Sequence, residues 1–313
     1  MAHFKPDLLE KLISIRGTSG DEGEIKAFLL SYINEHKNTW KHEVTVHTGD
    51  DFQDAIVLIF GKPKTAVFAH IDTIGFTVGY NNNLIKIGGP KTIDGMQLVG
   101  KDSQGEIETE LMIIENDEGQ QQLKCVADRT IDRGTNLSFK PNFNCTEEYV
   151  QTPYLDNRLG VLNALTLAEN LENGAIVFST YEEHGGGSVG FLGRFLYDNY
   201  NVRQALISDI TWVTDGIQHN GGVAISMRDK AIPRRSYLNK ILAIAKENNI
   251  KHQLEVESAG GSDGSMLQNT DLPFDWCFIG APEDHVHSPQ EKVFISDIEA
   301  MFSLYQLLMK RMN

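Results

Sequence analysis

Acidic and imidazole side chains that can bind divalent metals recur along the chain. They are His70, Asp72, Asp156, Glu182, Glu183, Asp209 and His287. Imidazole nitrogens and carboxylate oxygens are, with thiolates, the usual protein ligands of zinc. Five of these residues could hold two divalent ions and leave another carboxylate free to move a proton. That is the minimum equipment for metal-assisted hydrolysis of a peptide bond.

Three of these groups lie where apolar runs end, and such runs predict β-strands. The runs and the groups that follow them are 65–69 with His70, 175–180 with Glu182 and Glu183, and 205–207 with Asp209. Strand ends are where an α/β sheet opens its active-site crevice. The shared position favours one common site more strongly than any single group would.

The adjacent pair Glu182 and Glu183 is the strongest local signal. Two carboxylates at the end of an apolar strand repel each other and are costly to desolvate unless cations or solvent compensate them. One glutamate acting as a ligand and one as a general base would resolve this conflict. A metal lowers the pKa of bound water to about 7, and a base can take the released proton. An exposed charged turn is the alternative.

The other groups each have an ordinary structural explanation. His70 and Asp72 could form a turn, although an Asp72 that accepts from the imidazole would increase its basicity toward a metal. Asp156 precedes a predicted helix and could cap it. His285 lies two residues before His287, so either imidazole could reach a metal. These residues therefore have to be judged by the groups around them.

Alternating strands and helices predict an α/β fold with a mixed sheet flanked by helices on both faces. Helices are expected over 8–13, 25–33, 159–171, 189–197, 237–248, 265–268 and 297–312, and strands over 44–46, 55–60, 65–69, 175–180, 205–209, 253–256 and 275–279. Short strands and polar turns between 79 and 152 indicate a small all-β domain. We expect it to be inserted into a discontinuous catalytic domain over 1–78 and 153–313.

Composition argues against several classes of partner. The chain has 313 residues and a formal net charge of −15, without the clustered basic face that nucleic acid or anionic lipid would require. Its three cysteines are widely spaced, which indicates neither a disulfide framework nor a cysteine-rich zinc site. A signal-peptide core and a long apolar run are both missing, so we expect a cytoplasmic protein that does not bind membranes.

The assembled residues resemble the tetrahedral-type co-catalytic zinc aminopeptidases (glutamyl, leucyl and lysyl aminopeptidases). The matching motifs follow the family's order and span most of the chain. They are Ala69-His70-Ile71-Asp72, Ile74-Gly75-Phe76, Leu155-Asp156-Asn157-Arg158-Leu159-Gly160, Glu182-Glu183, Ser208-Asp209, Gly260-Gly261-Ser262-Asp263 and His287-Ser288-Pro289. Thr73 stands where the family usually has glutamate, which leaves the substrate specificity open.

The resemblance implies a role for each candidate and two divalent ions, zinc or cobalt. The implied roles are ligands of one ion for His70 and Asp209, ligands of the second for Glu183 and His287, a bridge for Asp156, the general base for Glu182, and an orienting partner of His70 for Asp72.

The intervals between motifs favour an aminopeptidase over its relatives. The interval from His70 to Asp156 can contain an inserted domain where aminopeptidases carry it, whereas the interval from Asp209 to His287 leaves no room for the lid domain of carboxypeptidase-type enzymes. We expect removal of N-terminal residues from short peptides by a homo-oligomer such as the family's twelve-subunit shell, with the insert mediating assembly. A carboxypeptidase or N-acyl amino acid deacylase, and a non-catalytic protein with a relic site, are the alternatives.

Overall fold

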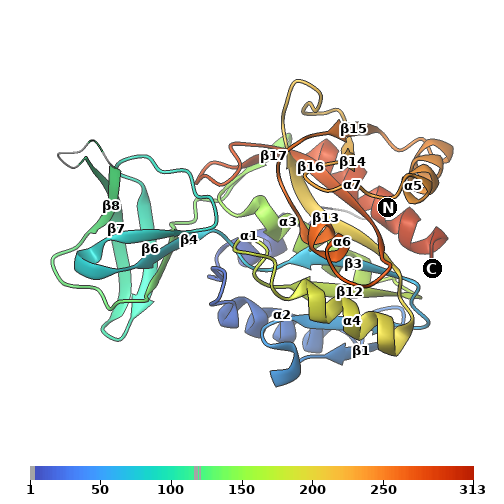
Figure 1. Cartoon of the computed structure of the whole chain (residues 1–313), viewed down its shortest axis with the longest axis horizontal. Helices are drawn as coiled ribbons and strands as arrows, with labels where there is room; N and C mark the ends of the chain where they lie inside the picture. The colour runs from blue at the N-terminus through green and yellow to red at the C-terminus, as the bar shows by residue number, and fades with distance from the viewer. Residues whose placement is uncertain (1–3, 116–118, 120) are drawn as a thin grey trace.

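A computed structural model describes residues 4–115, 119 and 121–313 of the chain. Figure 1 shows a main body of sheet and helices, from which a smaller sheet projects to one side. The expected segments 1–78 and 79–152 also contain residues 1–3, 116–118 and 120, which lie outside the described part. Among the residues that the structure does describe, no helix combines the length and apolar content required to cross a membrane.

The larger sheet contains eleven strands within the described residues. Its order is β1 (Val44–His47), β2 (Ile56–Phe60), β12 (Gly174–Ser179), β3 (Thr65–His70), β13 (Gln204–Trp212), β16 (Asp275–Asp284), β17 (Lys292–Phe294), β11 (Tyr149–Gln151) and β10 (Asn144–Cys145), while β14 (Val223–Arg228) pairs with both β16 and β15 (His252–Val256). The central strands β12, β3, β13 and β16 are parallel. Their carboxyl ends therefore meet at one edge of the sheet.

Alternating side chains give the sheet a hydrophobic core on each face. In β3, Val67 and Ala69 pack into one core, whereas Ala66 and Phe68 pack into the other. Helices α1 (Pro6–Ile13), α2 (Gly23–His36), α3 (Leu155–Ala168), α5 (Arg235–Glu247) and α7 (Ile295–Arg311) contribute to the first core, and α4 (Val189–Tyr200) and α6 (Asp263–Gln268) to the second. The predicted mixed sheet with helices on both faces is confirmed.

The smaller sheet is antiparallel and forms the projecting unit of Figure 1. Its order is β5 (Leu84–Ile87), β4 (Gly75–Val78), β9 (Asn136–Phe139), β6 (Gln97–Asp102), β7 (Gly105–Glu115) and β8 (Gln121–Val126). Two short 3-10 helices, η1 (Asp50–Phe52) and η2 (Tyr80–Asn82), complete the elements. The prediction that the fold carries an inserted all-β unit is confirmed.

Several strands differ from the sequence-based expectation. The prediction that a strand ends at Asp209 was wrong, because β13 continues beside β16 as far as Trp212. Strands β10, β11 and β17 were missed because runs of two or three residues show no periodicity. Strand β14 was also missed, since its first residues are buried without the alternation that marks a half-exposed strand.

Arg158 is a fully buried cation that joins the N-terminal segment to the sheet. Its guanidinium donates to the carbonyl oxygens of Leu12 and Ile15, each at 3.1 Å, and to that of Ile71. Burial lowers the pKa of Arg158 to about 10, which still leaves the group charged at neutral pH. One side chain of α3 therefore fixes the chain after α1 and after β3, next to His70.

Replacing Arg158 tests this anchor. Arg158→Met would remove three hydrogen bonds from a charged donor to carbonyl oxygens, at about 1–3 kcal/mol each. We expect the free energy of unfolding, measured by urea denaturation, to fall by about 3 kcal/mol or more. Arg311→Met is the control, because its half-exposed guanidinium forms a surface ion pair with Glu247 and its loss should change stability by less than about 1 kcal/mol. Equal effects of the two substitutions would contradict the anchor.

Candidate metal centre

The five predicted ligands come together at the carboxyl ends of the parallel strands. His70 is the last residue of β3, and Asp209 lies within β13. Glu183 follows β12, Asp156 lies at the start of α3, and His287 follows β16. Segments that are far apart in the sequence thus contribute to one cluster, as the site prediction required.

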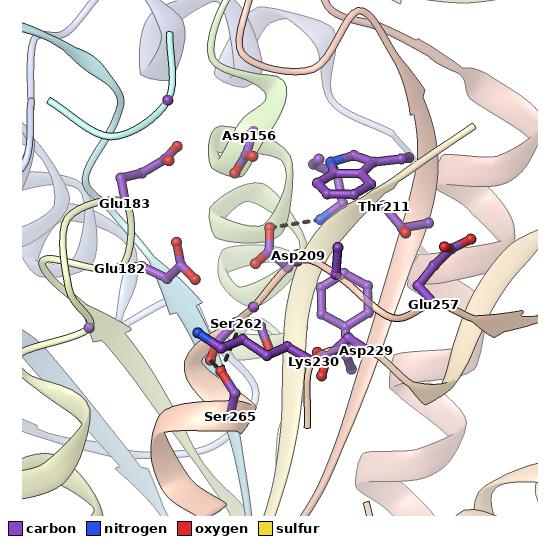
Figure 2. A pocket seen from close by; sticks show the side chains of 18 of the residues that line it. Asp156, Glu182, Glu183, Asp209, Thr211, Asp229, Lys230, Glu257, Ser262 and Ser265 are labelled. Carbon is purple, nitrogen blue, oxygen red and sulfur yellow. Dashed lines mark hydrogen bonds between the residues drawn. The ribbon is translucent and has the colours of Figure 1, made fainter. Parts of the chain in front are cut away.

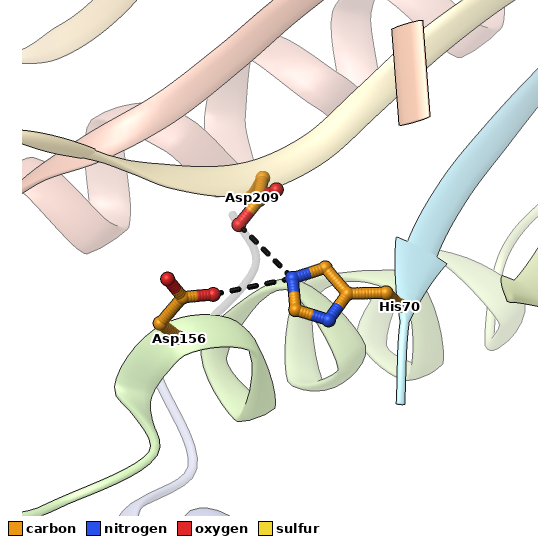
Figure 3. Close-up of side chains that lie close together, drawn as sticks. All are labelled: His70, Asp156 and Asp209. Atoms are coloured by element: carbon orange, nitrogen blue, oxygen red, sulfur yellow. Dashed lines mark ion pairs between the residues drawn. The ribbon is translucent and has the colours of Figure 1, made fainter. Parts of the chain in front are cut away.

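The first group of potential ligands consists of His70, Asp156 and Asp209 (Figure 3). His70 Nε2 lies 3.1 Å from Asp156 Oδ1 and 3.6 Å from Asp209 Oδ1. All three side chains are almost entirely removed from solvent. The group therefore presents one imidazole nitrogen and two carboxylate oxygens to a common point.

The second group consists of Asp156, Glu183 and His287. His287 Nε2 lies 3.3 Å from Asp156 Oδ2 and 3.2 Å from Glu183 Oε2. Asp156 thus turns one oxygen toward each imidazole. A carboxylate that bridges two cations must present its oxygens in this way.

The donor set and its spacing fit divalent metal ions. Ligands that lie about 2.0–2.2 Å from a tetrahedral zinc ion stand about 3.3–3.6 Å apart. The observed nitrogen to oxygen distances of 3.1–3.6 Å are close to this range. Within the described part of the chain, Glu183 Oε1 is also buried without a hydrogen-bond partner. A cation would compensate both that oxygen and the repulsion between the carboxylates.

The protein environment shifts the pKa values of these groups strongly. Burial raises the pKa of Glu183 to about 7, and repulsion from Asp156 adds to the shift. Burial also raises the pKa of Glu182 well above its ordinary value, with a further increase from Asp209 and Glu183. Burial lowers the pKa of His287, but its contacts with Asp156 and Glu183 outweigh burial and raise the value to about 11. These shifts indicate an excess of negative charge, which a cation at the centre of the cluster would offset.

Asn157 explains how Asp156 can face the cluster at the start of a helix. The backbone of both residues is non-helical, and regular helix begins after them. Asn157 Oδ1 accepts from the N–H of Gly160 at 2.9 Å, and its Nδ2 donates to the carbonyl of Ser208 at 2.9 Å. Gly160 is required here, since a Cβ would lie 2.1 Å from the Ser208 carbonyl oxygen. Asn157 thus caps the helix, which leaves the Asp156 carboxylate free.

The side chain of Asp72 holds the main chain of the glutamate pair, Glu182 and Glu183. The buried carboxylate accepts the N–H groups of Glu182 and Glu183, each at 3.0 Å, and the hydroxyl of Ser19. Its Oδ1 lies 3.5 Å from His70 Nδ1, while the Asp72 carbonyl oxygen is nearer to that nitrogen, at 3.2 Å. Sequence reasoning missed the contact with the pair, because it joins loops that are distant in the sequence.

Two further acids lie buried beside the cluster and were not predicted. Burial raises the pKa of both Glu283 and Glu291 well above the ordinary value, and repulsion from Asp156 contributes to both shifts. The N–H of Asp156 opposes the shift of Glu291 by donating to it. Cations at the two ligand groups would oppose both shifts. Neither was singled out from the sequence; Glu283 lies near the end of β16, and Glu291 lies immediately before β17.

The other nearby histidines do not join the ligand groups. The side chain of His285 is exposed, and His285 belongs to neither group of potential ligands. His184 Nδ1 accepts instead from the N–H of Gly88, which follows β5 of the smaller sheet. Of the histidines near the end of β16 and after β12, His287 is therefore the one that joins the cluster with His70.

A cavity of about 460 Å³ opens onto both ligand groups (Figure 2). The carboxylates of Asp156, Glu182, Glu183 and Asp209 converge on one side of it, and Glu257 lies across from the glutamate pair. The other walls include Ile210, Trp212, Asp229, Lys230, Met266 and Phe278. The cavity can therefore admit a small substrate with both polar and apolar parts.

Comparisons with known proteins agree with this arrangement. The chain matches the family model "M42 glutamyl aminopeptidase" over residues 87–304. A curated relative from Acetivibrio thermocellus, named "Putative aminopeptidase", is 27% identical, and the match covers 93% of this chain and 94% of the relative.

Two solved structures share the fold. Aminopeptidase APDkam598 from the archaeon Desulfurococcus kamchatkensis has a TM-score of 0.83 at 19% identity, covering 97% of this chain and 94% of that chain. The Pyrococcus horikoshii TET1 peptidase, which can assemble into a tetrahedron or a large octahedral shell, has a TM-score of 0.79 at 21% identity, covering 97% of this chain and 98% of that chain.

Proposed function

Because the chain belongs to the M42 glutamyl aminopeptidase family and is thus a peptide-bond hydrolase, we propose that it removes N-terminal residues from short peptides in a metal-dependent reaction. The proposal rests chiefly on Asp156, whose two oxygens face the imidazoles of His70 and His287 at 3.1 and 3.3 Å. This geometry supports a centre with two divalent ions that share one carboxylate.

The proposed ligands follow from the two groups. His70 and Asp209 would hold one ion, Glu183 and His287 the other, and Asp156 would bridge them. Zinc and cobalt suit this set, because both accept imidazole and carboxylate ligands. When bound, the ions would polarise the scissile carbonyl and lower the pKa of a water molecule to about 7.

Glu182 is the proposed general base. Its carboxylate lines the cavity but belongs to neither ligand group. It can therefore take a proton from the attacking water on a carboxylate oxygen and deliver it to the leaving amine. The hydrogen bond from its N–H to Asp72 Oδ1, at 3.0 Å, fixes the segment from which it acts.

The two adjacent glutamates should respond differently to the same substitution. Glu182→Gln should keep its metal and lower turnover about 10²- to 10⁴-fold, the usual contribution of a positioned base. Glu183→Gln should lose metal, because an amide is a poorer ligand than a carboxylate. Elemental analysis after dialysis, combined with a steady-state assay of each variant, separates these outcomes. The reverse pattern would exchange the two roles.

The cavity favours a substrate with a free α-amino group. Carboxylates line the cavity at the ligand groups and can accept hydrogen bonds from an amine. Enzymes that bind a substrate α-carboxylate commonly use the bidentate geometry of arginine. Among the described residues that line the cavity, none is an arginine. This composition supports an aminopeptidase over a carboxypeptidase or deacylase.

Peptide digests test this choice. We expect a short unmodified peptide to be shortened from its N-terminus one residue at a time, as followed by mass spectrometry. The same peptide should remain intact once N-acetylated, because acetylation removes the amine that the carboxylates would bind. A ladder that shortens from the C-terminus, or faster cleavage of the acetylated peptide, would assign the protein to the alternative class.

The inserted unit, proposed from the sequence to span residues 79–152, is the candidate assembly domain. Along the chain, its sheet begins with β4 and ends with β9, whereas β10 and β11 pair within the larger sheet. The unit exposes large apolar side chains, among them Tyr80, Ile85 and Val126. Exposed apolar surface of this kind marks protein interaction sites. The Pyrococcus horikoshii TET1 peptidase shares the fold and assembles into shells, which supports a homo-oligomer here as well.

Light scattering at micromolar concentration should therefore detect an oligomer. Ile85→Lys should shift the population toward smaller species, because the interface would have to bury a charge. Leu254→Lys is the control, since Leu254 is similarly exposed but lies on β15 of the main body. A monomeric wild-type protein would contradict the assembly role of the insert.

A further inference from the structure

We propose that Glu291 is a positioning residue that holds the main chain of two predicted metal ligands, Asp156 and His287. The inference rests on the proposed function, because the two segments that Glu291 joins carry Asp156 and His287 of the second ligand group. Glu291 is not a ligand in that assignment. It acts on the centre only through the two segments that it joins.

Both carboxylate oxygens of Glu291 are engaged, each with a different segment. Oε2 accepts the N–H of Asp156 at 3.2 Å, and Oε1 accepts the N–H of His287 at 2.9 Å. The Glu291 side chain is fully buried. One carboxylate therefore spans the start of α3 and the loop between β16 and β17.

Neither N–H group has a partner within regular secondary structure. Asp156 has non-helical dihedral angles at the first turn of α3, where no preceding helical carbonyl is available. His287 has a φ of 62°, in the left-handed region that side chains other than glycine seldom adopt. The bond from its N–H to Glu291 helps to hold the conformation in which His287 Nε2 faces Asp156 and Glu183.

The position of Glu291 is itself fixed by its neighbours. Its carbonyl oxygen accepts the N–H of Thr152 at 2.9 Å. The next residues form β17, which pairs with β11 immediately before Thr152. Glu291 thus joins His287 to the chain entering α3 by both main-chain and side-chain bonds, which sets the separation of the two ligands.

Asp72 provides a matching arrangement on the other side of the cluster. It is also a buried carboxylate, and it accepts the consecutive N–H groups of Glu182 and Glu183. Glu283, by contrast, is buried close by, but neither of its oxygens has a hydrogen-bond partner among the described residues. Substitution of Glu283 therefore measures the effect of removing a buried acid, apart from the effect of losing the two hydrogen bonds that Glu291 accepts.

Glu291→Gln in the full-length protein tests the inference. Glutamine keeps the shape but offers a single acceptor oxygen, so one N–H would face an amide NH₂ group. We expect titration of the metal-free protein with cobalt, followed by visible absorption, to show one of two ions bound about 10- to 100-fold more weakly. The ion that His287 would hold should weaken more than the other ion, because Asp156 belongs to both ligand groups and His287 to only one. General destabilisation would not produce this difference.

Glu283→Gln is the matched control and should leave both cobalt affinities within a few-fold of the wild type. Equal weakening in E283Q and E291Q would assign the effect to charge and overturn the inference, as would unchanged binding in E291Q. If E291Q does not fold, Glu291→Asp retains the acid with a shorter reach and should weaken the same ion; normal binding in E291D would overturn the inference. If the wild-type protein binds no divalent ion, the proposed function is wrong as well. If E291Q binds two cobalt ions with wild-type affinity, only the role of Glu291 is wrong.

Discussion

Repulsion among buried carboxylates is the constraint on which the rest of this structure depends. Asp156, Glu183 and Asp209 converge at the carboxyl ends of the parallel central strands, with the imidazoles of His70 and His287 between them. Removing several like charges from water is expensive unless positive charge and hydrogen bonds compensate them. The contacts between imidazole and carboxylate supply part of this compensation, and the two ligand groups are arranged so that divalent cations could supply the remainder.

The fold meets the constraint mainly through main-chain hydrogen bonds that lie just outside the cluster. Asp72 fixes the loop after β12, Glu291 fixes the start of α3 and the loop after β16, and Asn157 caps α3. In each case a buried side chain replaces the regular hydrogen bonds that a strand or helix terminus lacks. The reactive side chains are thereby left free to face the cavity, while their backbones are fixed.

Family membership and geometry support each other at different levels. The match over residues 87–304 identifies the M42 family, which confirms the resemblance inferred from the motifs. Solved structures at 19–21% identity superpose over nearly the whole chain, so the arrangement of sheets tolerates extensive sequence change. What such change must preserve is the hydrophobic alternation of the central strands, because a shift of one residue would turn the polar groups at their ends to the opposite face.

The sequence by itself determined the central strands, the inserted unit and the types of residue at the strand ends, because hydrophobic periodicity and adjacent carboxylates are local patterns. His70 and the pair Glu182 and Glu183 could be found in this way. Only the tertiary structure decided that the two oxygens of Asp156 face different histidines and that Glu291 is bonded to both segments. These are contacts between side chains and distant main-chain groups, and no spacing along the chain encodes them.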